Sequence, residues 1–171
     1  MEKIPEECAD YVKEYMIGKG YELDLQRVSN EAKAFARSVY LSGDGNSAWI
    51  FDVDETLLSN LPYYAQHGFG LEVFDSTKFG QWVEMGIAPV IESSLELYEE
   101  VLSLDSRSSE DHEKTATVYK SEKRSELVEQ GYQILGNSGD QWSDLLGSSM
   151  SIRSFKLPNP MYYISYQVSP H

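Results

Sequence analysis

The chain has 171 residues, a 41% hydrophobic and 12% aromatic composition, and 14 basic against 28 acidic side chains, so its formal net charge is −14. This size and apolar content suit one folded domain with its own core and exclude a disordered chain. The negative charge argues against nucleic acid and anionic membranes as partners. A single cysteine, Cys8, excludes an intramolecular disulfide framework, and three histidines do not provide Cys/His zinc spacing.

The hydrophobic runs are too short to span a membrane. The start of the sequence also lacks the basic and apolar regions that define a secretory signal peptide. From the sequence as given, we therefore expect a cytoplasmic protein.

Two helices are predicted near the start of the chain. The first covers residues 5–16, because Pro5 suits a first helical turn and Gly18 suits a helix end. The second covers about residues 25–39, where apolar side chains recur at helical spacing on one face: Val28, Ala32, Phe35 and Val39. These helices form an N-terminal helical segment, residues 1–46.

A core domain over residues 47–171 begins after a polar break at residues 42–46. Its first element is a strand over residues 48–53. The continuous apolar run there is typical of a parallel strand that is buried on both faces.

An aromatic-rich stretch over residues 59–86 follows this strand, and we interpret it as a small cap inserted into the core. Pro62, Gly68 and Gly70 predict an irregular backbone in the cap. Its aromatic side chains are expected to pack beneath it: Tyr63, Tyr64, Phe69, Phe74, Phe79 and Trp82. We expect His67 in this stretch to be a surface residue. A helix begins near residue 89 and carries an apolar stripe that we assign to the core: Ile91, Leu95, Tyr98 and Leu102.

The next stretch, residues 105–114, is polar, although a βα alternation calls for a further buried strand there. A helix is predicted over residues 116–130 and a short strand over residues 132–135. Residues 136–140 are rich in Gly, Asn and Ser and predict a turn. A third strand is predicted at residues 155–157, before a proline.

Acidic residues follow the first two strands in pairs: Asp52 with Asp54, and Asp140 with Asp144. Ligands of open α/β sheets bind beyond the carboxyl ends of the strands, so neighbouring parallel strands would bring the two pairs together. An oxygen-only group of this kind suits Mg²⁺. A lone D-x-D is a weak signal, and Asp140 and Asp144 also suit the capping of a short helix.

Such a site points to phosphate chemistry. With Mg²⁺ holding a phosphate oxygen, Asp52 could attack phosphorus in line and form an aspartyl-phosphate. Asp54 could protonate the departing alkoxide and later deprotonate the hydrolytic water. Crowding by a like charge raises a carboxyl pKa, which favours one shared proton at mildly acidic pH.

The segment Phe-Asp-Val-Asp-Glu-Thr-Leu-Leu-Ser-Asn, residues 51–60, resembles motif I of the haloacid dehalogenase superfamily of phosphotransferases. The chain is similar, more narrowly, to the plant acid phosphatases (class B-like) and vegetative storage proteins. This similarity covers the N-terminal helices at residues 5–39 and four later segments: residues 52–64, 119–124, 136–147 and 154–163. It implies an α/β, Rossmann-like fold with N-terminal helices and a small cap, and a secretory, vacuolar or extracellular location.

The resemblance also implies the roles of single residues. Asp52 is the nucleophile and Asp54 the general acid and base. Asp52, the backbone carbonyl of Asp54, and Asp140 hold Mg²⁺. Three residues complete the site: Lys120, which matches the motif III lysine that steadies the phosphoryl group, Thr56 as a second phosphate-binding residue, and Asp144 as a supporting motif IV acid.

The chain departs from this family between residues 104 and 113. Motif II, an apolar strand ending in Thr-Gly-Arg or similar, has no counterpart there, as if a βα unit of about 30 residues were absent. In the family, the motif II hydroxyl and backbone amide bind phosphoryl oxygens. We therefore expect a shortened sheet, an unpaired edge on the Asp52 strand, and impaired activity or a strained fold.

Our interpretation is an acid phosphatase that hydrolyses a small phosphomonoester. A non-catalytic vegetative storage protein is the main alternative: loss of motif II favours it, whereas retention of Asp52 favours the enzyme. A sugar-nucleotide transferase that uses D-x-D with manganese is weaker, because it leaves Asp140 and Asp144 unexplained. An exposed strand edge and the cap aromatics favour a homodimer.

Overall fold

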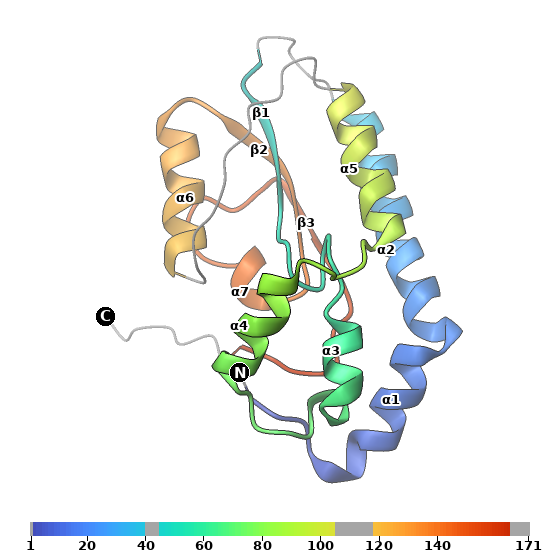
Figure 1. The fold of residues 1–171 in the computed structure, drawn as a ribbon. Helices are drawn as coiled ribbons and strands as arrows, with labels where there is room; N and C mark the ends of the chain where they lie inside the picture. The colour runs from blue at the N-terminus through green and yellow to red at the C-terminus, as the bar shows by residue number, and fades with distance from the viewer. Residues whose placement is uncertain (1, 40–44, 105–117, 165–171) are drawn as a thin grey trace.

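The computed structural model describes residues 2–39, 45–104 and 118–164. Its centre is a parallel, three-stranded sheet in the order β1-β2-β3. The strands are β1 (Ser47–Phe51), β2 (Gln133–Gly139) and β3 (Arg153–Lys156). Helices α2 and α5 lie side by side on one face of the sheet and α6 lies on the other (Figure 1). This layering confirms the α/β, Rossmann-like fold class.

The N-terminal part contains a short 3-10 helix η1 (Glu6–Cys8), then α1 (Ala9–Ile17) and α2 (Lys19–Ser38). The second helix starts six residues before the predicted position, because Gly18 is extended (φ −97°, ψ 178°) and serves as the N-cap of α2 as well as the end of α1. Predicted apolar residues of α2 do face the core: Ala32 is buried, and Val28 and Phe35 pack against the same cluster.

Helix α5 (Glu92–Leu104) packs along α2. Two ion pairs join these helices, from Lys33 to Glu96 at 2.7 Å and from Arg37 to Glu100 at 2.7 Å. The predicted stripe on α5 is partly wrong. Leu97 and Val101 face the core, whereas Tyr98 and Leu102 are 39% and 38% exposed. The buried face of α5 is determined by its packing against α2 and not by its apolar stripe alone. Ser93 and Ser94 are buried, and the hydroxyl of Ser29 in α2 donates to the Ser93 carbonyl.

The cap is more helical than predicted. It contains α3 (Leu61–Gln66), a 3-10 helix η2 (Gly68–Gly70) and α4 (Ser76–Met85). Pro62 lies in the first turn of α3, where proline is compatible with a helix. Asp75 caps α4 by accepting hydrogen bonds from the amides of Thr77 at 2.9 Å and Lys78 at 3.1 Å.

Most of the cap aromatics pack as predicted: four are buried and Phe79 packs against them, whereas Phe74 contacts Phe79 outside this cluster. A cluster of buried side chains joins the cap to the N-terminal helices and to the segment after β3: Ile4, Val12, Met16, Tyr21, Leu25, Tyr63, Tyr64, Phe69, Trp82, Ile91, Leu157, Met161 and Tyr162. A second cluster lies between the sheet and helices α2 and α5. The cap is therefore fixed to the body of the protein next to the carboxyl ends of the strands.

The later elements begin with α6 (Val118–Glu129), followed by β2 and a four-residue helix α7 (Trp142–Leu145). Part of the helix predicted at 116–130 and the polar tract at 105–114 lie outside the described residues. Residues 136–139 were predicted to form a turn, but they are strand. The third strand begins at Arg153, two residues before the predicted start.

Strand β1 is half-buried along its length, and not fully buried as predicted. It ends the described sheet, so only one of its edges is paired there, with β2. Whether a further strand pairs with the other edge stays a prediction, because the stretch where it was sought, residues 105–113, lies outside the described residues. Among residues 2–39, 45–104 and 118–164, no helix combines the length and apolar composition needed to cross a bilayer.

Candidate active site

The carboxyl ends of β1 and β2 bring two predicted aspartates to one edge of the sheet. Asp52 follows β1 directly, and its amide donates to the carbonyl of Ser138 in β2 at 2.9 Å. Asp140 follows the last residue of β2. The parallel pairing of these strands therefore brings Asp52 together with the second acidic pair, Asp140 and Asp144, at the same edge.

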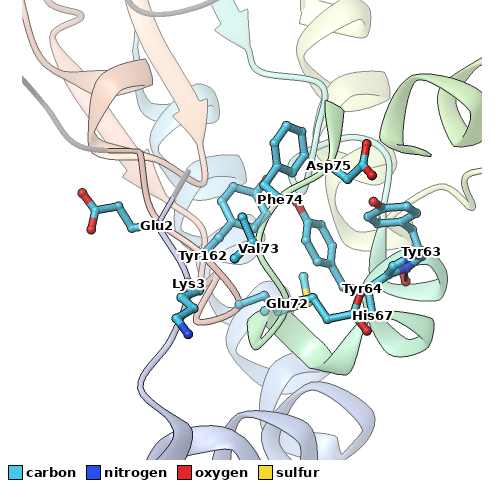
Figure 2. A pocket seen from close by; sticks show the side chains of 12 residues that line it. Glu2, Lys3, Tyr63, Tyr64, His67, Glu72, Val73, Phe74, Asp75 and Tyr162 are labelled. Atoms are coloured by element: carbon cyan, nitrogen blue, oxygen red, sulfur yellow. Dashed lines mark hydrogen bonds between the residues drawn. The ribbon is translucent and has the colours of Figure 1, made fainter. Parts of the chain in front are cut away.

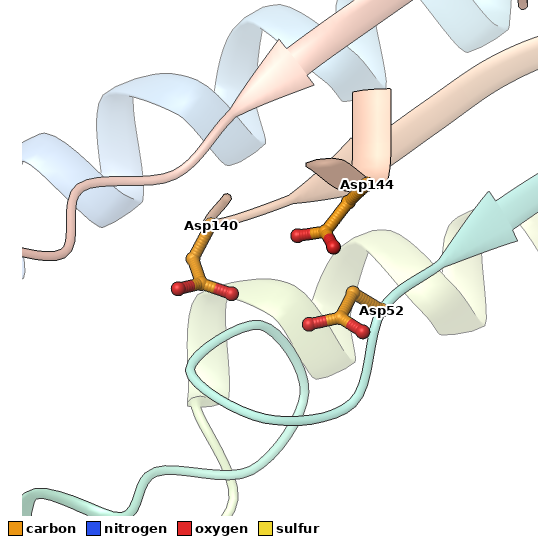
Figure 3. Close-up of side chains that lie close together, drawn as sticks. All are labelled: Asp52, Asp140 and Asp144. Carbon is orange, nitrogen blue, oxygen red and sulfur yellow. The ribbon is translucent and has the colours of Figure 1, made fainter. Parts of the chain in front are cut away.

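Asp52, Asp140 and Asp144 form a carboxylate cluster (Figure 3). One oxygen from each of the three side chains lies within 4.8 Å of the other two. Asp140 and Asp144 are buried. Three carboxylates this close together, two of them buried, repel one another unless a cation or a bound proton reduces their charge. Carboxylate oxygens are hard donors that suit a divalent cation such as Mg²⁺.

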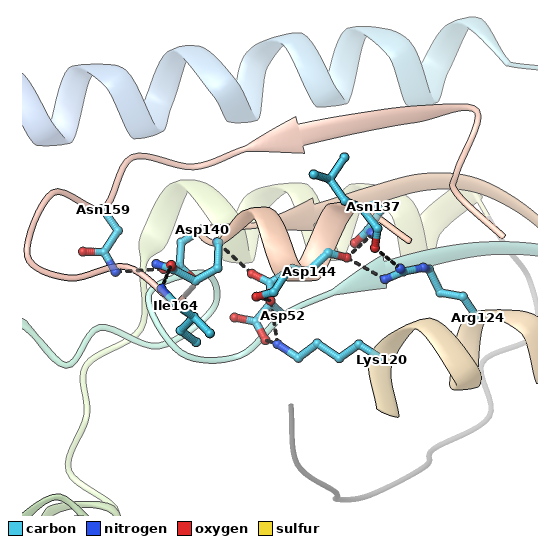
Figure 4. Close-up of polar contacts among 11 residues, drawn as sticks. Asp52, Lys120, Arg124, Asn137, Asp140, Asp144, Asn159 and Ile164 are labelled. Atoms are coloured by element: carbon cyan, nitrogen blue, oxygen red, sulfur yellow. Dashed lines mark hydrogen bonds and ion pairs between the residues drawn. The ribbon is translucent and has the colours of Figure 1, made fainter. Parts of the chain in front are cut away.

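Lys120 supplies one positive charge to the cluster (Figure 4). The lysine lies near the start of α6, where its ammonium contacts the Asp52 carboxylate and donates to Asp144 Oδ1 at 2.8 Å. Burial, and then the neighbouring Asp144, raise the pKa of Asp52 to about 7, and Lys120 acts in the opposite direction. Burial lowers the pKa of Lys120, but the two carboxylates outweigh it, and the net pKa is raised.

Asp144 serves the cluster and also caps a helix. Its Oδ2 accepts from the amide of Gln141 at 2.8 Å, as the N3 residue of a capping box at the start of α7. Its Oδ1 accepts from Lys120. The two roles proposed for this residue from sequence are thus compatible, because each uses a different carboxylate oxygen.

Arg124 and Asn137 belong to the site but were not predicted from sequence. Arg124 is 1% exposed, and its guanidinium donates to the carbonyls of Asp144 at 2.6 Å and Leu146 at 2.5 Å. Asn137 in β2 donates to the Asp144 carbonyl at 2.8 Å. Together they fix α7 against α6 and the sheet, which sets the position of the Asp144 side chain (Figure 4).

Asp140 is held by two amide side chains that were also missed. Gln141 Nε2 and Asn159 Nδ2 both donate to Asp140 Oδ2, at 2.6 and 2.8 Å. Burial raises the pKa of Asp140, while these hydrogen bonds oppose that effect. Because both donors reach the same oxygen, the other carboxylate oxygen remains available to a ligand.

The loop after β1 places Asp54 apart from the carboxylate cluster. Asp54 is exposed, and its Oδ1 accepts from Asn60 Nδ2 at 2.9 Å. Thr56 is completely buried, and its hydroxyl has no hydrogen-bond partner among the described residues. The phosphate-binding role of Thr56 and the metal-binding carbonyl of Asp54 therefore stay predictions.

Glu55, between these two residues, is also completely buried and has a positive φ of 54°. Its Oε1 accepts from the amide of Asn60 at 2.8 Å, whereas Oε2 has no partner among the described residues. Burial, as the largest cause, raises the pKa of Glu55 to about 8. Through its hydrogen bond to Asn60, the Glu55 side chain stabilises the loop that carries Asp52 and Asp54.

A pocket in the cap region is also lined by Glu2 and Lys3 and by Met161 and Tyr162 of the segment after β3 (Figure 2). It is lined mainly by aromatic and acidic residues: Glu2, Lys3, Tyr63, Tyr64, His67, Gly70, Glu72, Val73, Phe74, Asp75, Met161 and Tyr162. His67 is not a simple surface residue, because its ring stacks on Tyr63 at 4.1 Å between centroids and its Nδ1 lies 2.8 Å from the Tyr63 carbonyl oxygen.

Comparison with known proteins gives consistent matches. A family model described as HAD superfamily, subfamily IIIB (acid phosphatase), matches residues 1–107 and 103–165. Acid phosphatase 1 of Solanum lycopersicum is 57% identical, over 94% of this chain and 76% of the relative. Vegetative storage protein 1 of Arabidopsis thaliana is 36% identical, over 94% of this chain and 72% of the relative. Both relatives are plant proteins.

A solved structure shows the same fold. The class C acid phosphatase from Bacillus anthracis with tungstate bound has a TM-score of 0.57 to this chain, with 18% sequence identity. The superposition covers 91% of this chain and 85% of the bacterial one.

These comparisons also bear on the predicted absence of motif II. The two family matches meet at residues 103–107. The alignment with the Solanum lycopersicum protein spans 194 positions but covers 94% of this chain, about 161 of its 171 residues, so about 33 positions of the relative have no counterpart here. The matches nevertheless extend over nearly the whole chain, and it belongs to the acid phosphatase family of the haloacid dehalogenase superfamily, subfamily IIIB.

Proposed function

We propose that this chain hydrolyses small phosphomonoesters by transferring the phosphoryl group to Asp52. One observation carries the proposal: the Asp52 carboxylate contacts Lys120 and lies in one cluster with Asp140 and Asp144, at the carboxyl edge of a parallel sheet. This arrangement supports the proposed roles of Asp52 as nucleophile, of Lys120 as the cation for phosphoryl oxygens, and of the carboxylates as hard oxygen ligands.

In the first step, an Asp52 oxygen forms a bond to phosphorus while the bond between phosphorus and the ester oxygen breaks. The leaving alkoxide takes a proton from Asp54, which is the general acid. The Lys120 ammonium offsets negative charge on the phosphoryl oxygens as it builds up. The product of this step is an aspartyl-phosphate on Asp52 and a free alcohol.

In the second step, water attacks phosphorus and gives a proton to Asp54, which now acts as the base. The bond between phosphorus and the Asp52 oxygen breaks, inorganic phosphate leaves, and Asp52 is restored. The proton taken from Asp54 in the first step is thereby returned to it.

We assign the cluster of Asp52, Asp140 and Asp144 to a divalent cation, and Mg²⁺ suits its all-oxygen donor set best. When bound, such a cation neutralises charge on a phosphoryl oxygen and on the three carboxylates. Asp52 and Asp140 would be its side-chain ligands. Asp144, which already accepts from Lys120 and Gln141, would support them.

The proposal is tested by hydrolysis of a chromogenic aryl phosphate between about pH 4 and about pH 7, with MgCl₂ or with EDTA. We expect metal-dependent turnover that is lost in Asp52→Asn and kept in Asp10→Asn, a control at an exposed position in α1. Circular dichroism and a thermal melt establish that each variant is folded. A folded parent chain with no turnover at any pH would overturn the proposal.

That result would instead support a storage role. One observation favours this second function: vegetative storage proteins are among the relatives, and the family model matches this chain in two parts that meet at residues 103–107, near the stretch where motif II is expected. A storage protein needs a stable fold and no turnover, so the same experiment separates the two functions.

We also propose that the protein belongs to the plant secretory route, to the vacuole or to the extracellular space. In support, a relative that is 37% identical is the stem 28 kDa glycoprotein of Glycine max, which by its name carries sugar. Fractionation of plant tissue with an antibody to this chain tests the location, and recovery only with cytosolic markers would contradict it.

A further inference from the structure

We propose that Asn60 is a positioning residue for catalysis: its side-chain amide holds the Asp54 carboxylate in place, and Trp82 of the cap holds that amide. The inference rests on the proposed role of Asp54 as general acid. It adds a component that lies outside the carboxylate cluster and links the cap to the proton-transfer step.

The hydrogen bonds of Asn60 carry this inference. The residue is 2% exposed, and each of its polar atoms has a partner. The amide nitrogen donates to Glu55 Oε1 at 2.8 Å, and the carbonyl accepts from the amide of Tyr64 at 3.0 Å. In the side chain, Oδ1 accepts from the Trp82 indole at 2.7 Å and Nδ2 donates to Asp54 Oδ1 at 2.9 Å.

Helix capping does not explain this side chain. Asn60 is at the N-cap of α3, a position that asparagine often occupies because its side chain accepts from the first amides of the helix. Here the side chain makes no such hydrogen bond. It instead reaches Asp54, six residues earlier in the chain, and Trp82 in α4.

Trp82 determines which end of the amide faces Asp54. An indole N–H can only donate, so its partner must be the amide oxygen of Asn60. The amide nitrogen is then left to donate to the Asp54 carboxylate. The opposite orientation would place two donors together at Trp82 and two acceptors together at Asp54, and both hydrogen bonds would be lost, the one to Trp82 in a buried place.

The bond to Asn60 has a direct consequence for Asp54. The Asp54 side chain is exposed, so packing does not select its rotamer. Because Oδ1 is occupied by Asn60, Oδ2 is the oxygen that carries the proton to the leaving group. Precise placement of this oxygen is what a general acid requires.

The experiment replaces Trp82 by Phe, which keeps an aromatic ring in the cap core and removes the indole N–H. Trp49→Phe is the matched control: Trp49 donates a single hydrogen bond, to Ser138 Oγ at 3.1 Å, and does not contact Asp54 or Asn60 in the described structure. For both variants, kcat/KM is measured with a series of phosphomonoesters whose leaving groups range from nitrophenol to simple alcohols.

A poor leaving group needs protonation more than a good one. We therefore expect Trp82→Phe to reduce kcat/KM about tenfold more for an alkyl phosphate than for a nitrophenyl phosphate. Trp49→Phe should reduce both equally or not at all. An equal reduction for both substrates in Trp82→Phe would show a purely structural role and would overturn the inference.

A second measurement does not depend on turnover. The indole N–H resonances of Trp49, Trp82 and Trp142 are recorded by NMR in the parent chain and in Asp54→Ala. Loss of the acceptor at Asp54 should shift the Trp82 resonance through Asn60 and leave the Trp49 resonance in place. An unchanged Trp82 resonance would contradict the coupling. If the resonance shifts but the parent hydrolyses no ester, the coupling holds and the proposed function fails.

Discussion

At Asp52, the positive charge of Lys120 opposes the effects of burial and of the neighbouring carboxylates on the pKa. Burial and the neighbouring Asp144 raise its pKa to about 7, whereas Lys120 favours the ionised form. A nucleophilic carboxylate must be ionised to attack phosphorus. The ammonium of Lys120 therefore favours the ionised form of the proposed nucleophile, Asp52, before any substrate binds, in addition to its proposed action on the phosphoryl oxygens.

Glu55 provides a prediction about the pH dependence of stability. Its pKa in the folded chain is raised from 4.5 to about 8, so the folded state binds a proton more tightly than the unfolded state. Between these two values stability should fall as pH rises, by up to about 1.4 kcal/mol per pH unit. Glu55→Gln removes this term, so the variant should gain stability relative to the parent from about pH 5 to about pH 8.

Urea denaturation at a series of pH values measures this difference. Subtracting the variant from the parent cancels the contributions of Asp52 and Asp140, whose pKa values are also raised. Glu84→Gln, at an exposed position in α4, controls for the loss of one negative charge. A difference between Glu55→Gln and the parent that does not change with pH would show that Glu55 has an ordinary pKa.

At the scale of elements, β2 shows where sequence patterns mislead. Residues 136–139 are rich in glycine and polar side chains, which predicts a turn, but they continue the strand. The two glycines there are needed for close packing. A Cβ on Gly136 would lie 2.4 Å from the ring of Trp49, and a Cβ on Gly139 would lie 2.6 Å from the Cβ of Asp144. Composition alone does not separate this use of glycine from a turn.

Prediction from sequence is limited in a similar way for the contacts of the candidate active site. The meeting of Asp52 and Asp140 was predictable, because carboxyl ends of neighbouring parallel strands share an edge. The contacts of Arg124 and Asn159 were not, since they depend on how α6 and the segment after β3 pack around α7. The side-chain contacts of Asn60 could not be predicted for another reason. Its position before a helix predicts capping, but the structure shows that its side chain binds Asp54 and Trp82 instead.

Gly139→Ala tests the close packing of β2 against α7. The added methyl group must displace Asp144, so we expect weaker binding of Mg²⁺ and lower activity, with a loss of stability of about 1–3 kcal/mol. Gly80→Ala is the control, because a Cβ at this position in α4 meets no atom within 4 Å. Isothermal calorimetry and denaturation compare the two variants. Equal Mg²⁺ affinity in Gly139→Ala and the parent would show that Asp144 does not depend on this contact.

At the scale of the whole molecule, negative charge acts in two ways: through the net charge of the chain and through the cluster of three carboxylates. The net charge of −14 makes the compact chain repel itself. Any added salt reduces this repulsion by screening. The carboxylate cluster is a separate, local concentration of negative charge, with Asp52, Asp140 and Asp144 against the contacting ammonium of Lys120. General screening does not depend on ion type, whereas binding of a cation by the cluster does, so the proposed cation site can be tested without a substrate.

We expect MgCl₂ to raise the melting temperature more than NaCl at the same ionic strength, because only the folded chain holds the three carboxylates together. At a hundred times the dissociation constant, the gain is about 2.7 kcal/mol. Asp140→Asn should lose this difference while keeping the response to NaCl, which depends on net charge alone. If MgCl₂ and NaCl stabilise the parent equally, the cluster does not bind Mg²⁺, and Lys120 is then the cation that balances it.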